Sequence, residues 1–185
     1  MPKIADIEFT PNPNAKRFVL KEPLTRGVAK SFETAYEATQ DPLASALFAV
    51  PNVTNVYYVD RYLTVTQDGG ADWSVLERQL AQPIREAPAA SETDASVARP
   101  AVELNLSEED QARLENINAI LDERVRPALM MDGGGLEIMG LEGHQLKIHY
   151  MGACGTCPSS ISGTLMGIEG LLRSTVDPEI EVVAV

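Results

Sequence analysis

The chain has 185 residues, of which 44% are hydrophobic and 23% charged, a composition typical of globular proteins that bury a core. Its 27 acidic and 15 basic residues give a net charge of -12, which repels phosphate backbones and argues against nucleic-acid binding. The first twenty residues lack the apolar run of a signal peptide, and Asp6 and Glu8 do not suit an acid-poor transit peptide. No later stretch is long enough to span a membrane. We therefore predict a cytoplasmic protein without nucleic-acid or membrane partners.

A polar stretch of simple composition divides the chain. Residues 87–101 are rich in Ala, Pro, Ser and Thr and have no periodic apolar face, so they cannot offset the entropy cost of ordering themselves. We therefore predict an α+β protein with two small domains, at residues 1–86 and 107–185, joined by a flexible linker at residues 87–106.

The first domain is predicted to contain four strands and two short helices. Asp41 is a suitable N-cap for a helix with Pro42 at its first position, and Asp72 can cap the last helix. The predicted strands are residues 4–10, a segment through Phe18 and Leu20, residues 53–59 and residues 62–66. This domain has no His, no Cys and no cluster of catalytic side chains, which argues against an active site in it.

The second domain is predicted to open with a helix. Ser107 is its N-cap and Asp110 completes a capping box. Pro127 is expected to kink or end that helix before the glycines at 133–135. Two strands of alternating apolar residues follow, then the loop MGACGTCPSS, a helix that begins at Pro158, and a closing strand. The predicted order is α-β-β-α-β, with the CxxC loop before the second helix.

Cys154 and Cys157 are the only cysteines and lie three positions apart. A turn can direct both sulfurs at one centre, and the N-terminus of the following helix favours the thiolate forms that bind soft metals. Structural zinc sites and cubane clusters usually take four ligands, so one chain supplies half of a set and a twofold dimer would supply the rest. We expect the loop thiols to be partly exposed, so that replacing either one by Ala leaves the fold intact.

Three kinds of site can use such a pair of cysteines, namely a zinc site, a redox disulfide and an iron–sulfur cluster. A thioredoxin-like redox fold needs more strands after the helix than the remaining residues allow. A zinc site could recruit His144 and His149, but strand alternation turns His149 outward and His144 lies in a turn. A binding module with a structural metal stays open as a second class of function.

The second domain resembles the C-terminal domain of the NifU family, the Nfu-type iron–sulfur carriers. The motifs that carry this likeness are VRPAL at residues 125–129, MDGGG at 131–135 and GACGTCPSS at 152–160. The first domain resembles the N-terminal domain of the same carriers. Its matching motifs are TPNPN at residues 10–14, SFETAYEA at 31–38 and DPLASALF at 41–48.

This resemblance implies a carrier or scaffold that binds a 4Fe-4S cluster, or a 2Fe-2S cluster at some stage, between two chains and transfers it to apo-proteins. Cys154 and Cys157 match the cluster ligands of the family position for position. The implied partners are a second copy of the chain when the cluster is bound, apo iron–sulfur client proteins and upstream assembly proteins. No catalytic residue is implied, and the protein is predicted not to be an enzyme.

Overall fold

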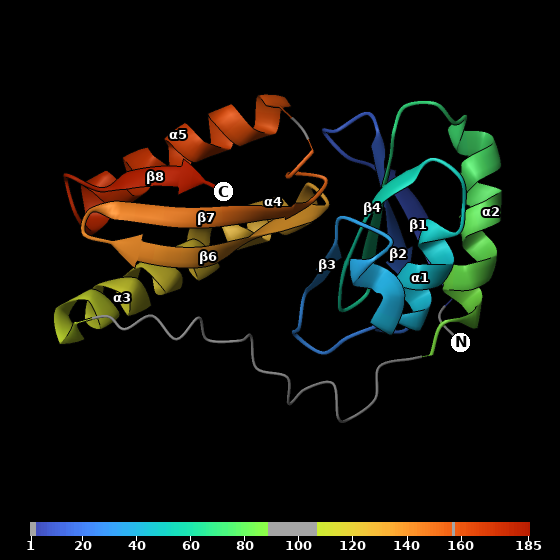
Figure 1. The fold of residues 1–185 in the computed structure, drawn as a ribbon, viewed down its shortest axis with the longest axis horizontal. Helices are drawn as coiled ribbons and strands as arrows, with labels where there is room; N and C mark the ends of the chain where they lie inside the picture. The colour runs from blue at the N-terminus through green and yellow to red at the C-terminus, as the bar shows by residue number, and fades with distance from the viewer. Residues whose placement is uncertain (1–2, 89–106, 157) are drawn as a thin grey trace. The chain divides into compact units, whose positions relative to one another are not determined.

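The computed structural model describes residues 3–88, 107–156 and 158–185. The chain divides into two compact units, Met1–Arg99 and Pro100–Val185 (Figure 1). Residues 89–106, which hold most of the predicted linker, lie outside the described residues, so the linker and the domain boundaries stay predictions. Among the described residues, no helix combines the length and apolar character that crossing a membrane requires.

The first unit is a five-stranded antiparallel sheet with the strand order β1-β2-β5-β4-β3. Two of its connections are hairpins: β1 pairs with β2, and β4 pairs with β5. The strands are β1 Ile4–Phe9, β2 Ala15–Leu20, β3 Lys30–Phe32, β4 Val53–Val59 and β5 Tyr62–Gln67. The helices are the 3-10 turn η1 Glu37–Gln40, α1 Pro42–Phe48 and α2 Trp73–Glu86.

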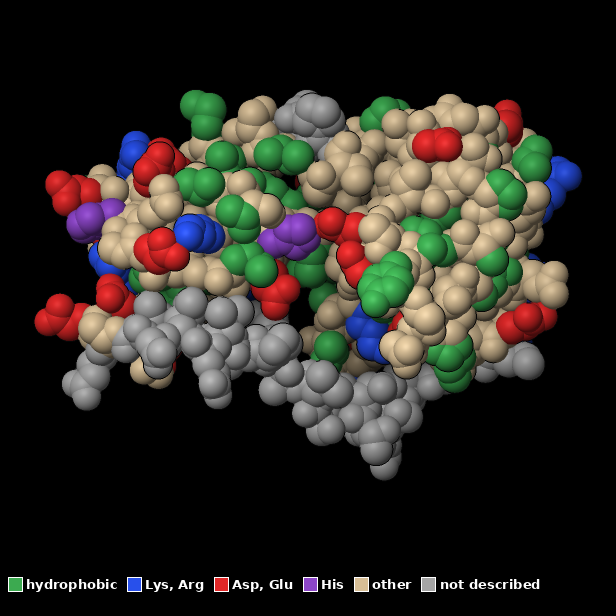
Figure 2. Space-filling view, viewed as in Figure 1, with side chains coloured by type: hydrophobic (Ala, Val, Ile, Leu, Met, Phe, Trp, Pro, Cys, Tyr) green, Lys and Arg blue, Asp and Glu red, His purple; other side chains and the backbone are tan. Residues whose placement is uncertain are grey.

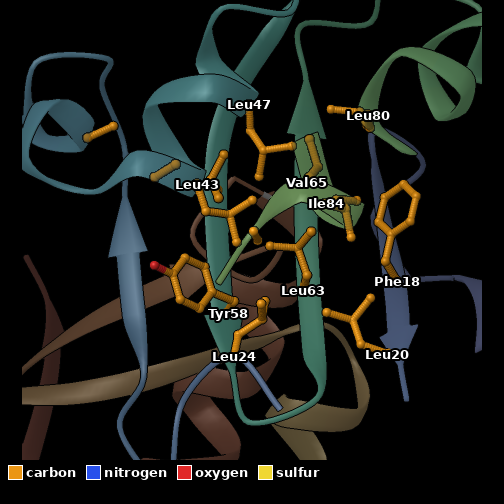
Figure 3. Close-up of a cluster of buried hydrophobic side chains, with 14 of the residues drawn as sticks. Phe18, Leu20, Leu24, Leu43, Leu47, Tyr58, Leu63, Val65, Leu80 and Ile84 are labelled. Atoms are coloured by element: carbon orange, nitrogen blue, oxygen red, sulfur yellow. The ribbon is translucent and has the colours of Figure 1, made fainter. Parts of the chain in front are cut away.

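Capping residues start the helices of the first unit where the sequence predicted. The Asp41 carboxylate accepts a hydrogen bond from the Ala44 N–H at 2.9 Å, and the Asp72 carboxylate accepts one from the Ser74 N–H at 2.7 Å. Apolar side chains of α1 and α2 then pack on one face of the sheet (Figure 3). The sheet and helix residues labelled in this core include Phe18, Leu47, Leu63, Leu80 and Ile84.

The second unit is a three-stranded sheet with the order β6-β7-β8, in which β6 and β7 are antiparallel and β7 and β8 are parallel. Inward-facing residues of β7 share one apolar core with α3, α4 and α5, so the three helices cover one face of the sheet. The elements are α3 Glu108–Arg124, α4 Arg126–Met131, β6 Gly134–Glu142, β7 Gln145–Gly152, α5 Pro158–Thr175 and β8 Glu181–Ala184 (Figure 1).

The predicted α+β class is confirmed, but the predicted order of the second domain needs one correction. The first helix is two helices, α3 and α4, which break at Val125. Pro127 has no N–H and its ring clashes with the preceding turn, so it occupies the first turn of a new helix more easily than the interior of the old one. The predicted cap at Ser107 is confirmed, since its hydroxyl accepts a hydrogen bond from the Asp110 N–H at 3.1 Å.

The surface carries the negative charge that the composition requires. Acidic side chains are spread over both units on the face shown in Figure 2, and the basic side chains visible there form no continuous patch. Several basic residues are engaged in ion pairs with neighbouring carboxylates, for example Lys147 with Glu142 at 2.7 Å.

Candidate functional site

The cysteine loop joins the end of β7 to the start of α5. Gly152, the last residue of β7, has a φ of +66°, which suits glycine and turns the chain out of the sheet. The loop is then fixed to the turn after α4, because the Ala153 N–H donates to the Gly133 carbonyl at 3.2 Å. Inside the loop, the Gly155 N–H donates to the Gly152 carbonyl, also at 3.2 Å. Cys157 lies outside the described residues.

Cys154 is buried within its own chain, and the prediction of a partly exposed thiol is wrong for this residue. Its exposed fraction is 3%, and it belongs to the apolar core formed by the helices and the sheet of the second unit. The loop turns inward after Gly152, so that Ala153 is also only 2% exposed. The Cys154 side chain is therefore part of the packing of the unit as well as a candidate ligand.

Gly134 makes room for the cysteine. It is the first residue of β6 and stands opposite Gly152 in the antiparallel register. A Cβ atom at Gly134 would lie 2.5 Å from the Met151 carbonyl oxygen and 2.7 Å from Cys154 Sγ, distances that real Cβ atoms do not reach. Only glycine fits there, because any side chain would push the sulfur or the strand away.

The middle glycine of the MDGGG motif therefore has a specific role, which the sequence analysis did not identify. The sequence places the glycines at 133–135 after the end of the preceding helix, and Gly133 follows α4 with a φ of +83°, which suits glycine. The contact of Gly134 with the cysteine is a tertiary one, and no local pattern indicates it.

Tyr150 is a further polar group at this site. It faces inward from β7, is 4% exposed and lies in the same apolar core as Cys154. Burial, and secondly the charge of a Cys154 thiolate, raises the pKa of Tyr150 to about 12. Its hydroxyl group therefore keeps its proton at neutral pH. The alternation Leu146, Ile148, Tyr150 indicated the inward direction, but not the neighbouring cysteine.

The two histidines have partners away from the cysteine loop. His144 Nδ1 lies 2.7 Å from the Asp177 carboxylate, and its Nε2 lies 3.4 Å from that of Glu179. His149 Nδ1 lies 2.8 Å from the Val185 carbonyl oxygen. Within the part of the chain that the structure describes, no three His, Cys, Asp or Glu side chains gather closely enough to hold a metal ion.

Comparison with known proteins agrees with the two-unit organisation. Residues 4–91 match the family model described as "Scaffold protein Nfu/NifU N terminal", and residues 117–183 match the "NifU-like domain". The human protein named "NFU1 iron-sulfur cluster scaffold homolog, mitochondrial" is 32% identical over 173 residues, which cover 93% of this chain and 67% of the human protein. This chain belongs to the Nfu/NifU family.

The fly relatives give the same result. The protein of the same name from Drosophila sechellia is 31% identical over 93% of this chain and 61% of its own length. The chain thus spans about three fifths of the fly relatives that it matches. A solved structure of a NifU-like protein from Saccharomyces cerevisiae is 26% identical, covers 44% of this chain and 76% of that chain, and has a TM-score of 0.41.

The relatives overturn the predicted cytoplasmic location. The fly and human relatives named above are described as mitochondrial. The prediction relied on the composition of the first twenty residues. The composition of a short stretch is a weak indicator of the compartment in which a protein works.

Proposed function

We propose that this protein is an iron–sulfur cluster scaffold and carrier, in which Cys154 and Cys157 of two chains hold one 4Fe-4S cluster and release it to apo-proteins. Its membership of the Nfu/NifU family and the name of its human relative, an iron–sulfur cluster scaffold homolog, support the scaffold role. The single observation that carries the proposal is the CxxC pair in the matched NifU-like domain, with Cys154 enclosed between β7 and Gly134.

The number of sulfur donors supports a site shared between two chains. Each chain has two cysteines, both in this loop. A cubane takes four thiolate ligands, and a twofold axis brings the same loop of two chains to one centre. Among the described residues, no three His, Cys, Asp or Glu side chains of one chain gather closely enough to hold a metal ion, so nothing described there completes a set within one chain.

The surroundings of Cys154 suit a soft metal cluster. Apolar side chains exclude water from the sulfur, and exclusion of water protects a cluster from hydrolysis and oxidation. The neighbouring backbone of Gly134 approaches the sulfur without a side chain in between. The cluster is cargo in this proposal, and the protein acts as its holder. We assign the chain no catalytic residue.

Anaerobic loading with iron and sulfide tests the proposal. We expect a brown protein that contains iron and acid-labile sulfide in equal amounts. When it is mixed with an apo iron–sulfur enzyme, that enzyme should regain more activity than it does with free iron and sulfide. The matched control is the Cys154→Ala chain treated in the same way. Stoichiometric zinc without sulfide in protein isolated anaerobically would support a structural metal site and contradict the carrier.

A further inference from the structure

The hydroxyl group of Tyr150 is buried without a hydrogen-bond partner among the described residues. Its side chain is enclosed by the core of the second unit, and no donor or acceptor within that part of the chain reaches the oxygen. A buried hydroxyl group that has lost water and gained no partner destabilises a fold, and native proteins rarely keep one without a reason. A phenylalanine would fill the same space at no such cost.

The chemistry of the neighbouring cysteine suggests the missing partner. Tyr150 and Cys154 belong to one core cluster and lie four positions apart, Tyr150 near the end of β7 and Cys154 in the loop that follows it. A thiol is a weak acceptor of hydrogen bonds, whereas a thiolate bound to iron is a charged acceptor. A tyrosine hydroxyl group ordinarily titrates at about pH 10, so it carries a proton at neutral pH and can act as a donor.

We propose that Tyr150 donates a hydrogen bond to the sulfur of Cys154 when that sulfur binds the cluster, and that this bond slows the release of the cluster. The inference rests on the proposed function and adds a residue to its site. Hydrogen bonds to the ligand sulfurs stabilise negative charge on them and raise the reduction potential of a cluster. Tyr150 thus sets how tightly and at what potential the cargo is held.

Three other hydroxyl groups in the described part of the chain are buried without a partner, those of Ser31 on β3 and of Thr64 and Thr66 on β5. They lie in the first unit, which has no cysteine and therefore no sulfur that a hydroxyl group could stabilise. What distinguishes Tyr150 is that a candidate ligand lies in the same core.

The test is the Tyr150→Phe variant of the full chain, compared with wild type before and after loading. Because the variant loses only an unpartnered hydroxyl group, the apo-protein should melt at the same temperature as wild type or higher. The loaded variant should lose its cluster to a chelator about tenfold faster or more, and its midpoint potential should be more negative. The potential is a readout that a purely structural role would leave unchanged.

The matched control is Tyr58→Phe, which removes the hydroxyl group of a buried tyrosine in the first unit. It should leave cluster release and the potential as in wild type. Equal release rates and potentials for Tyr150→Phe and wild type would overturn the inference and leave the proposed function standing. A drop in the apo melting temperature with an unchanged potential would also overturn it. A wild type that takes up no cluster would overturn the proposed function, and this inference with it.

Discussion

Each unit has a buried tyrosine, and the hydroxyl groups of the two tyrosines differ in their hydrogen-bond partners. In the first unit, the hydroxyl group of Tyr58 donates to the Asp41 carboxylate, which also accepts from the Ala44 N–H and pairs with Lys30 at 3.1 Å. In the second unit, the hydroxyl group of Tyr150 has no partner within the described residues and shares its core with Cys154. Tyr58 therefore serves the fold of its own unit, whereas we assign Tyr150 to a site that a ligand completes.

Among substitutions that test this difference between the units, Cys154→Ala is expected to have the largest effect on cluster binding. The alanine has no donor atom, so bound iron should fall to background. The second unit should also lose about 1–2 kcal/mol of stability, because the sulfur is buried and its removal leaves a small cavity. Iron analysis and thermal unfolding followed by circular dichroism measure the two effects.

The first unit supplies an internal control for the Cys154→Ala experiment. The only tryptophan of the chain, Trp73, lies in that unit and packs against its core. Its fluorescence unfolding transition should be unchanged by the substitution. Full retention of iron by Cys154→Ala would show that this cysteine is not a ligand.

Gly134→Ala should have the next largest effect on cluster binding. The new Cβ atom would collide with the Met151 carbonyl oxygen and with Cys154 Sγ, so the strand or the sulfur must move. We expect a loss of about 2–3 kcal/mol in the stability of the second unit and faster loss of the cluster. Chemical denaturation followed by circular dichroism, and iron retention after gel filtration, measure both.

A glycine elsewhere in the same unit offers the matched substitution. Gly170 lies on α5, and a Cβ atom there would have nothing within 4 Å outside its own helix. Gly170→Ala should stabilise the unit by about 0.5–1 kcal/mol, because alanine favours the helix. Equal effects of the two substitutions would contradict the close approach at Gly134.

The smallest expected effect is a pH dependence of the stability of the first unit. Burial raises the pKa of Asp41, but hydrogen bonds from the Ala44 N–H, Tyr58 and Lys30 outweigh it, so the pKa lies below its ordinary value of 3.8. A carboxyl group whose pKa is lowered by folding stabilises the fold at pH values above its unfolded-state pKa. That contribution is lost as the pH falls through its folded-state pKa. Asp41→Asn should therefore cost about 1 kcal/mol near neutral pH and progressively less in acid.

Urea unfolding followed by Trp73 fluorescence at several pH values measures this difference. The second unit has its own carboxylate with a lowered pKa, Asp177, held by the Glu179 N–H and by His144. Asp177→Asn should leave the Trp73 transition unchanged at every pH. A cost of Asp41→Asn that stays the same from neutral to acidic pH would contradict the role of the ionised carboxylate.

Local signals in the sequence predicted most of the helices and strands. Caps such as Asp41 and Ser107 act over three residues, and both start helices where they were expected. The edge strand β3 was missed, because its three residues, Lys30–Phe32, are too few to show an alternating pattern. These residues form a strand because they pair with β4, and no pattern within the three residues indicates that pairing.

The candidate site was only partly predictable, for a similar reason. The spacing of Cys154 and Cys157 and the surrounding motif identified the candidate ligands. The burial of Cys154 and its contact with Gly134 depend on β6 and the cysteine loop meeting across the end of the sheet. Residues twenty positions apart carry no shared periodic signal, so the sequence pattern could not show that contact.

The sharing of one cluster between two chains can be measured by native mass spectrometry of the full chain after anaerobic loading with iron and sulfide. We expect a species of two chains that carries one 4Fe-4S cluster, and its loss when both cysteines are replaced. A single chain that holds a complete cubane on its own would contradict the shared site.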